Sequence, residues 1–127
     1  MVAAERRKQI RFYLLKRFEK VKQILDDAVQ NQDIGAHGAF WRPLNLEAFK
    51  EKRVFGRQLV NPGNGAQSNL VLALRGQMPF GSDMGVNDAS YPRMPAGGFP
   101  PVPDDRIAFI EKWIDDGCPD DDFESGA

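Results

Sequence analysis

The sequence is poor in the side chains that most often carry chemistry, because its 127 residues include one cysteine, Cys118, and one histidine, His37. A lone cysteine excludes an internal disulfide. A hydrolytic triad, a histidine-rich zinc site and a type-1 copper site all need more than these two residues offer. A phosphate-binding glycine loop followed by Lys and Ser or Thr is also missing from the sequence. We therefore expect no catalytic residue, no metal ligand and no enzymatic activity.

Long apolar runs and a large excess of charge of one sign are missing as well. No run is long enough to cross a membrane, so we expect no membrane partner. The N-terminus has neither the apolar segment nor the small-residue cleavage site of a signal peptide, which predicts a cytoplasmic protein. The net charge of −1 gives no reason to expect a nucleic-acid partner.

The charged residues are distributed unevenly along the chain. Basic residues concentrate in 4–29 and acidic residues in 104–127. If the helices at the two ends meet, these opposite charges attract each other, and we prefer this structural interpretation to a nucleic-acid-binding patch. The acidic end also surrounds Cys118, and negative neighbours are expected to raise the pKa of its thiol and make it unreactive.

Hydrophobic periodicity predicts one all-α domain spanning 1–127. The expected helices lie near 4–29, 45–55, 68–75 and 104–116, with Asn45 and Ser68 as N-caps and Gly117 as the last helix stop. Residues 77–103 hold six of the nine prolines and show no periodicity, which predicts a long loop. The domain is thus divided into a long N-terminal helix (1–30), two short middle helices, the long loop (77–103) and a C-terminal helix (104–117).

The most informative stretch runs from Met94 to Pro119 and reads MPAGGFPPVPDDRIAFIEKWIDDGCP. Its Pro/Gly-rich loop precedes an amphipathic helix that contains Trp113. Upstream, the residues DIGAHG at 33–38 follow the first predicted helix. In this order the chain resembles small class I cytochrome c domains of bacteria, in which an MPxGG-PP loop precedes the closing helix. The resemblance implies a small cytochrome c-like helical fold in which the N- and C-terminal helices cross.

Aligned on His37, the resemblance places the family's two haem-attachment cysteines at Asp33 and Ala36, which have no thiol. It places the family's axial haem ligands at His37 and Met94. One interpretation is a haem-free cytochrome c-like domain without a cofactor, acting as a non-enzymatic interaction or accessory module whose partner is another protein. The alternative is an electron carrier that binds haem noncovalently through His37 and Met94.

Two large apolar side chains, Phe40 and Trp41, follow the histidine closely. They either fill the volume that a haem would occupy, which we prefer, or form an exposed patch for a partner. A partner surface would also include the long loop. The candidate partner-binding residues are therefore Phe40, Trp41, Met78, Phe80, Met84 and Phe99.

Overall fold

The computed structural model describes residues 16–30, 39–54, 56–77, 80–81, 91–95 and 99–122 of the chain. Its helices are α2 (Arg17–Ala28), α3 (Leu46–Glu51), the short 3-10 helix η1 (Gly65–Gln67), α4 (Asn69–Arg75) and α5 (Asp104–Asp115). Its strands are β1 (Arg53–Val54), β2 (Arg57–Gln58), β3 (Phe80–Gly81) and β4 (Tyr91–Pro92). The described part is mostly helical, as the periodicity predicts. None of its helices has the length and apolar character that a membrane span needs.

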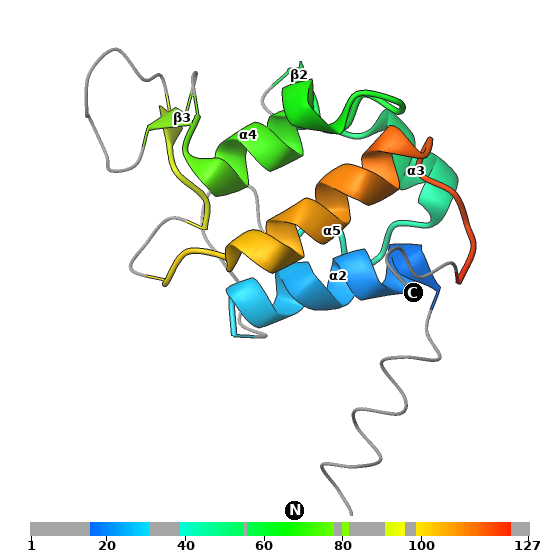
Figure 1. The fold of residues 1–127 in the computed structure, drawn as a ribbon, viewed down its shortest axis with the longest axis horizontal. Helices are drawn as coiled ribbons and strands as arrows, with labels where there is room; N and C mark the ends of the chain where they lie inside the picture. Colours follow the sequence, from blue (N-terminus) through cyan, green and yellow to red (C-terminus); the bar gives the residue numbers. More distant parts are fainter. Residues whose placement is uncertain are drawn as a thin grey trace, which may run out of the picture.

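The helix α5 lies at the centre of the described structure, with α4 packed on one side and α2 on the other (Figure 1). Its isoleucines recur at spacings of three and four, so they share one stripe of the helix and are buried together. The buried stripe consists of Ile107, Ile110, Trp113 and Ile114. The first and last described helices therefore meet, as expected from the sequence.

Three aromatic rings fill the junction between α2, α3 and α5. Phe18 stacks on Trp113 with ring centroids 5.9 Å apart, and Phe49 meets Trp113 edge-on at the same centroid distance. Trp113 is completely buried, and its indole N–H donates to the carbonyl oxygen of Pro119 over 3.0 Å. Because the one polar atom of the indole is satisfied, this junction can stay dry at little cost.

Opposite charges join the start of α2 to the end of the described chain. The guanidinium of Arg17, which is only 4% exposed, donates two hydrogen bonds to Asp121, of 2.7 and 2.9 Å, and one of 2.7 Å to Asp116. Arg17 first, and then Lys112, hold the pKa of the Asp116 carboxyl below its ordinary value. Lys16 and Asp120 add a weaker exposed pair at 3.6 Å. The expected attraction between the two ends is confirmed for Lys16 and Arg17, whereas the part of the predicted first helix before residue 16, with its basic residues, lies outside the described residues.

The second predicted helix is shorter than expected. Asn45 caps α3 by accepting a hydrogen bond from the backbone N–H of Ala48, as predicted, but the helix ends at Glu51 rather than near Gly56. The chain then forms an antiparallel hairpin in which β1 pairs with β2. Gly56, with φ of +79°, supplies the left-handed residue that a tight hairpin turn requires. The pairing of Val54 with Arg57 therefore replaces the last turns of the predicted helix.

A close approach of backbone to backbone fixes η1 on α5. The N–H of Gly65 donates to a carboxylate oxygen of Asp115 over 2.7 Å, and the N–H of Gly63 donates to the carbonyl oxygen of Ile114 over 2.7 Å. A Cβ atom at Gly65 would lie against the backbone carbonyl oxygen of Glu111. This contact therefore needs glycine at position 65.

Ser68 occupies the N-cap position of α4 as predicted, but its hydroxyl does not cap the helix. It is fully buried, accepts a hydrogen bond from the N–H of Asn61 and donates one to the carbonyl oxygen of Asn64. The serine therefore stabilises the turn before η1 rather than the helix that follows. Its preference for local backbone partners explains why the sequence pattern is ambiguous.

The last helix ends as the sequence predicts. Gly117 has φ of +92°, and its N–H donates to the carbonyl oxygen of Ile114, while the N–H of Cys118 donates to that of Trp113. These two bonds form a Schellman motif, which satisfies the last carbonyls of the helix. The motif also turns Cys118 into the core, where it is 1% exposed.

The long loop 77–103 contains regular structure that the sequence did not predict. Within its described residues, β3 and β4 form a two-residue parallel pair in which Phe80 lies opposite Tyr91. The backbone N–H of Met94 then donates to the carbonyl oxygen of Ala73 over 2.9 Å, which ties the loop to α4. These backbone bonds hold the residues after β4 beside the end of α4.

Candidate functional site

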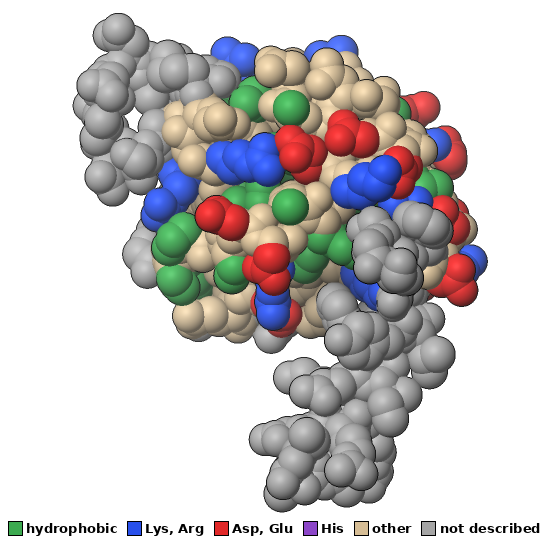
Figure 2. Space-filling view, in the orientation of Figure 1, with side chains coloured by type: hydrophobic (Ala, Val, Ile, Leu, Met, Phe, Trp, Pro, Cys, Tyr) green, Lys and Arg blue, Asp and Glu red, His purple; other side chains and the backbone are tan. Residues whose placement is uncertain are grey.

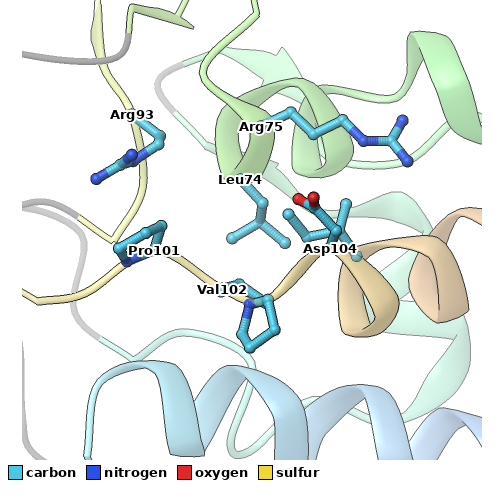
Figure 3. Close-up of a pocket in the computed structure, with 8 residues that line it drawn as sticks. Leu74, Arg75, Arg93, Pro101, Val102 and Asp104 are labelled. Atoms are coloured by element: carbon cyan, nitrogen blue, oxygen red, sulfur yellow. The ribbon is translucent and has the colours of Figure 1, made fainter.

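An open groove lies where α4 ends and α5 begins, with the proline-rich stretch before α5 as its wall (Figure 3). Its volume is about 410 Å³. The groove is lined by Leu74, Arg75, Arg93, Pro101, Val102, Pro103, Asp104 and Ile107. Three of these side chains, Leu74, Val102 and Ile107, are buried members of the hydrophobic core. The surface of the groove therefore combines core hydrophobic residues with charged residues at its rim.

Arg93 is the unusual side chain of this groove. Its Nε atom is buried from solvent and has no hydrogen-bond partner, the one such side-chain atom in the part of the chain that the structure describes. Buried donors are nearly always paired in folded proteins, and leaving one unpaired is costly. Within the described residues this nitrogen therefore has neither a protein acceptor nor access to solvent.

The second arginine of the groove is already paired. Arg75 makes a two-pronged contact with Glu111, over 2.8 and 3.2 Å, and this hydrogen-bonded guanidinium holds the pKa of the Glu111 carboxyl below its ordinary value. Arg75 and Arg93 extend to opposite sides of Leu74 (Figure 3). Asp104 lies at the start of α5 on the rim of the groove. Its negative charge adds to that of Glu111 in raising the pKa of Arg75.

The predicted haem ligands are not both within the described residues. Met94 is half-buried and packs against the hydrophobic core, while its backbone is fixed to Ala73. His37 lies outside the described residues, so the approach of His37 to Met94 stays a prediction. Met78 and Met84, two of the candidate partner-binding residues, also lie outside the described residues.

The two aromatic residues after the histidine take different positions. Trp41 is 4% exposed, and its indole N–H donates to Asp26 on α2 over 2.7 Å. Phe40 is half-buried, meets the Trp41 ring edge-on, and has the ammonium group of Lys52 over its own ring at 5.8 Å. Trp41 therefore offers no exposed surface to a partner, whereas Phe40 keeps part of its ring accessible.

A lysine on α2 holds the segment that carries these aromatic residues. The Lys22 ammonium donates to the carbonyl oxygens of Arg42 and Leu44 and lies 4.9 Å from the centre of the Phe18 ring. This charged anchor and the Trp41–Asp26 hydrogen bond both connect the segment to α2. The position of Trp41 is thus fixed twice, by the hydrogen bond of its own side chain and by the bonds of Lys22 to the backbone that follows it.

The remaining candidates from the long loop are also largely covered. Phe80 is 8% exposed, and Phe99 is half-buried against the core. Cys118 is buried too, and burial raises the pKa of its thiol to about 11, an effect that Lys50 opposes. The direction of this pKa shift agrees with the sequence prediction, but its cause is loss of solvent rather than the neighbouring carboxylates.

The groove residues Arg75, Arg93 and Asp104 were not identified as a site from the sequence. They belong to three separate segments, and the backbone bond between Met94 and Ala73 helps to bring the second segment beside the first. The sequence offers only an arginine directly before the Met-Pro pair, which does not by itself indicate a site. Figure 2 shows positive, negative and hydrophobic side chains interspersed over the face of the molecule that is seen in Figure 1.

Within the described residues, no group of three or more His, Cys, Asp or Glu side chains is arranged to hold a metal ion. No family model, no curated protein and no solved structure matches the chain.

Proposed function

We propose that the chain is a haem-free cytochrome c-like domain that serves as a non-enzymatic binding module for another protein. The observation that carries this proposal is the position of Trp41, which is buried, hydrogen-bonded to Asp26 and packed with the hydrophobic core. A side chain fixed in this way occupies interior volume, and Trp41 lies only four positions after His37, the residue that would ligate a haem. In this proposal the aromatic residue replaces the cofactor as the filler of the fold.

Two further features support a filled interior. The Phe18, Phe49 and Trp113 rings contact one another, so the described helices already pack without a cofactor between them. Met94 contacts the same hydrophobic core and can serve as a flexible apolar filler. A core completed by its own side chains gains its stability from burial of hydrophobic surface rather than from ligand binding.

The proposal is tested by restoring the attachment thiols. The double variant Asp33→Cys, Ala36→Cys is exported to a periplasm with a functional haem-attachment system, and covalent haem is measured after denaturation. Trp41 is expected to block the cofactor, so the double variant should carry little covalent haem. Adding Trp41→Ala to the double variant removes the blocking side chain and should increase the haem content.

Full haem attachment in the double variant would contradict the proposal. If the double variant with Trp41 intact carries one haem per chain, the interior is not filled by this tryptophan. The noncovalent electron carrier with His37 and Met94 as ligands then becomes the preferred function.

A further inference from the structure

We propose that Asn64 is a site of spontaneous deamidation, which the fold keeps closed as long as η1 stays packed on α5. The reaction converts an amide into a carboxylate, so it would record the release of η1 as a permanent change of the chain. This inference does not depend on whether the chain binds haem or another protein.

The sequence supplies the reacting groups, because Asn64–Gly65 is the one Asn-Gly pair in the chain. In this reaction the backbone nitrogen of Gly65 forms a bond to the side-chain Cγ of Asn64, and the Cγ–Nδ2 bond breaks. The proton of the Gly65 nitrogen leaves with the departing group as ammonia, and water then opens the resulting succinimide ring to Asp or isoaspartate. Glycine favours ring closure because no side chain hinders its nitrogen and its backbone adapts freely.

The backbone of Asn64 holds these groups apart. Its ψ angle is 74°, which places the Gly65 nitrogen and the Asn64 Cβ on opposite sides of the Cα–C bond. Ring closure needs both atoms on the same side, so the peptide unit between Asn64 and Gly65 has to turn over before the nitrogen reaches Cγ. The folded conformation of this pair is therefore unreactive.

Two hydrogen bonds oppose that rotation, one at each end of the peptide unit. The Gly65 N–H donates to a carboxylate oxygen of Asp115 over 2.7 Å, and the Ser68 hydroxyl donates to the carbonyl oxygen of Asn64 over 2.9 Å. Turning the unit breaks both bonds. Because α5 supplies one of the two acceptors, the reactive conformation requires η1 to separate locally from α5.

Local opening is enough to start the reaction. The Asn64 side chain is already exposed to solvent, so water reaches it without further rearrangement. Gly63 precedes it with φ of +91°, and its N–H is held by the carbonyl oxygen of Ile114 over 2.7 Å. Once the bonds to Ile114 and Asp115 open, a glycine lies on each side of the asparagine and the segment gains wide backbone freedom.

The products fit the closed state less well than asparagine does. Deamidation places a carboxylate in the residue directly before the N–H that Asp115 accepts, and like charges near each other disfavour the packed state. The isoaspartate product also inserts one methylene into the main chain, which shifts the Gly65 N–H relative to its acceptor. We therefore expect a deamidated η1 to return less completely to α5.

The test follows deamidation at position 64 by peptide mapping and mass spectrometry in the full chain, aged at mildly alkaline pH. Folded protein and protein unfolded in urea are aged in parallel. The folded protein should react much more slowly, since only its open fraction can close the ring. Asp115→Ala should raise the rate in the folded protein about fivefold, because one exposed hydrogen bond no longer opposes opening. In urea its rate should equal that of the unchanged chain.

Matched variants separate this contact from general effects, and the amide spectrum of each variant verifies its fold. Asp105→Ala removes another exposed carboxylate of α5, roughly 15 Å away along the helix, and should react as the unchanged protein does. Asp115→Asn keeps an oxygen that can accept the Gly65 N–H, so its rate should lie between those of the unchanged protein and Asp115→Ala. The product mimic Asn64→Asp should increase amide hydrogen exchange at Gly63 and Gly65.

Several results would overturn the proposal. Absence of deamidation at position 64 in the unfolded chain would remove the site, and equal rates in the folded and unfolded chains would show that the fold does not close it. No acceleration in Asp115→Ala, or the same acceleration in Asp105→Ala, would exclude release of η1 from Asp115 as the controlling step. Unchanged amide exchange in Asn64→Asp would contradict the lasting effect on η1. None of these results bears on the thiol-restoration test of the haem-free module.

Discussion

Replacing Gly65 by alanine tests the packing of η1 on the central helix. The added Cβ would lie 2.8 Å from Cγ of Glu111 and 3.0 Å from a carboxylate oxygen of Asp115, and also against the Glu111 carbonyl. The backbone of α5 is fixed by its own hydrogen bonds, so η1 has to move. Overpacking of this kind costs about 1–3 kcal/mol. Loss of the Gly65–Asp115 hydrogen bond adds about 1 kcal/mol, because Asp115 is exposed.

The expected decrease in the free energy of unfolding is therefore about 2–4 kcal/mol, measured by urea denaturation with an unchanged m-value. Gly56→Ala is the matched control, because a Cβ there meets nothing within 4 Å and only the positive φ of +79° is strained. That strain alone costs about 1 kcal/mol. If Gly65→Ala were no more destabilising than Gly56→Ala, η1 would not pack against α5 as described.

Three other predictions concern the core and its ion pairs. Trp113→Ala should lower the free energy of unfolding by about 3–5 kcal/mol in the same assay, and a loss below about 1 kcal/mol would place Trp113 outside the core. Cys118 should react slowly with iodoacetamide at neutral pH and rapidly in urea, because its thiol is buried and its pKa is about 11; rapid native alkylation would contradict this. Because Arg75 lowers the folded-state pKa of Glu111, the stabilisation by this pair is present above the unfolded pKa of about 4.5 and is lost as the pH falls through the folded value. Glu111→Gln should therefore be less stable than the unchanged protein at pH 7, with a difference that shrinks in acid; a constant difference in urea-unfolding curves across this range would refute the linkage.

Local signals predicted the helical part of the fold well. The spacing of Ile107, Ile110 and Ile114 predicted the buried face of α5, and Gly117 predicted its end. Asn45 predicted the start of α3 because an asparagine N-cap acts through a bond to a residue three positions away. Such signals depend on neighbours in the sequence and need no knowledge of the tertiary structure.

The features that sequence reasoning missed depend on which of several competing partners the chain adopts, or on burial in the folded core. The predicted length of α3 was wrong, because the Val54–Arg57 pairing rather than helix propensity determines the conformation after Glu51. The predicted capping role of Ser68 was wrong, because its hydroxyl forms hydrogen bonds with the backbone of the preceding turn. The predicted cause of the Cys118 pKa shift was wrong, because the thiol is buried in the core and loss of solvent raises its pKa.

The candidate site divides in the same way. A large aromatic side chain at position 41 could be expected to need burial, and Trp41 is buried. The groove could not be predicted, because Arg75, Arg93 and Asp104 lie in three separate segments that only the tertiary structure brings together. The convergence of His37 with Met94 remains a prediction from the resemblance.

The central proposal, that the chain is a haem-free cytochrome c-like domain, is tested most directly by an absorption spectrum. The purified protein is measured as expressed and again during titration with haemin, alongside His37→Ala and Met94→Ala. We expect no covalent haem, no sharp Soret band on titration and no low-spin histidine–methionine spectrum. A stoichiometric low-spin complex that either variant abolishes would contradict the claim and would identify the protein as a noncovalent haem carrier.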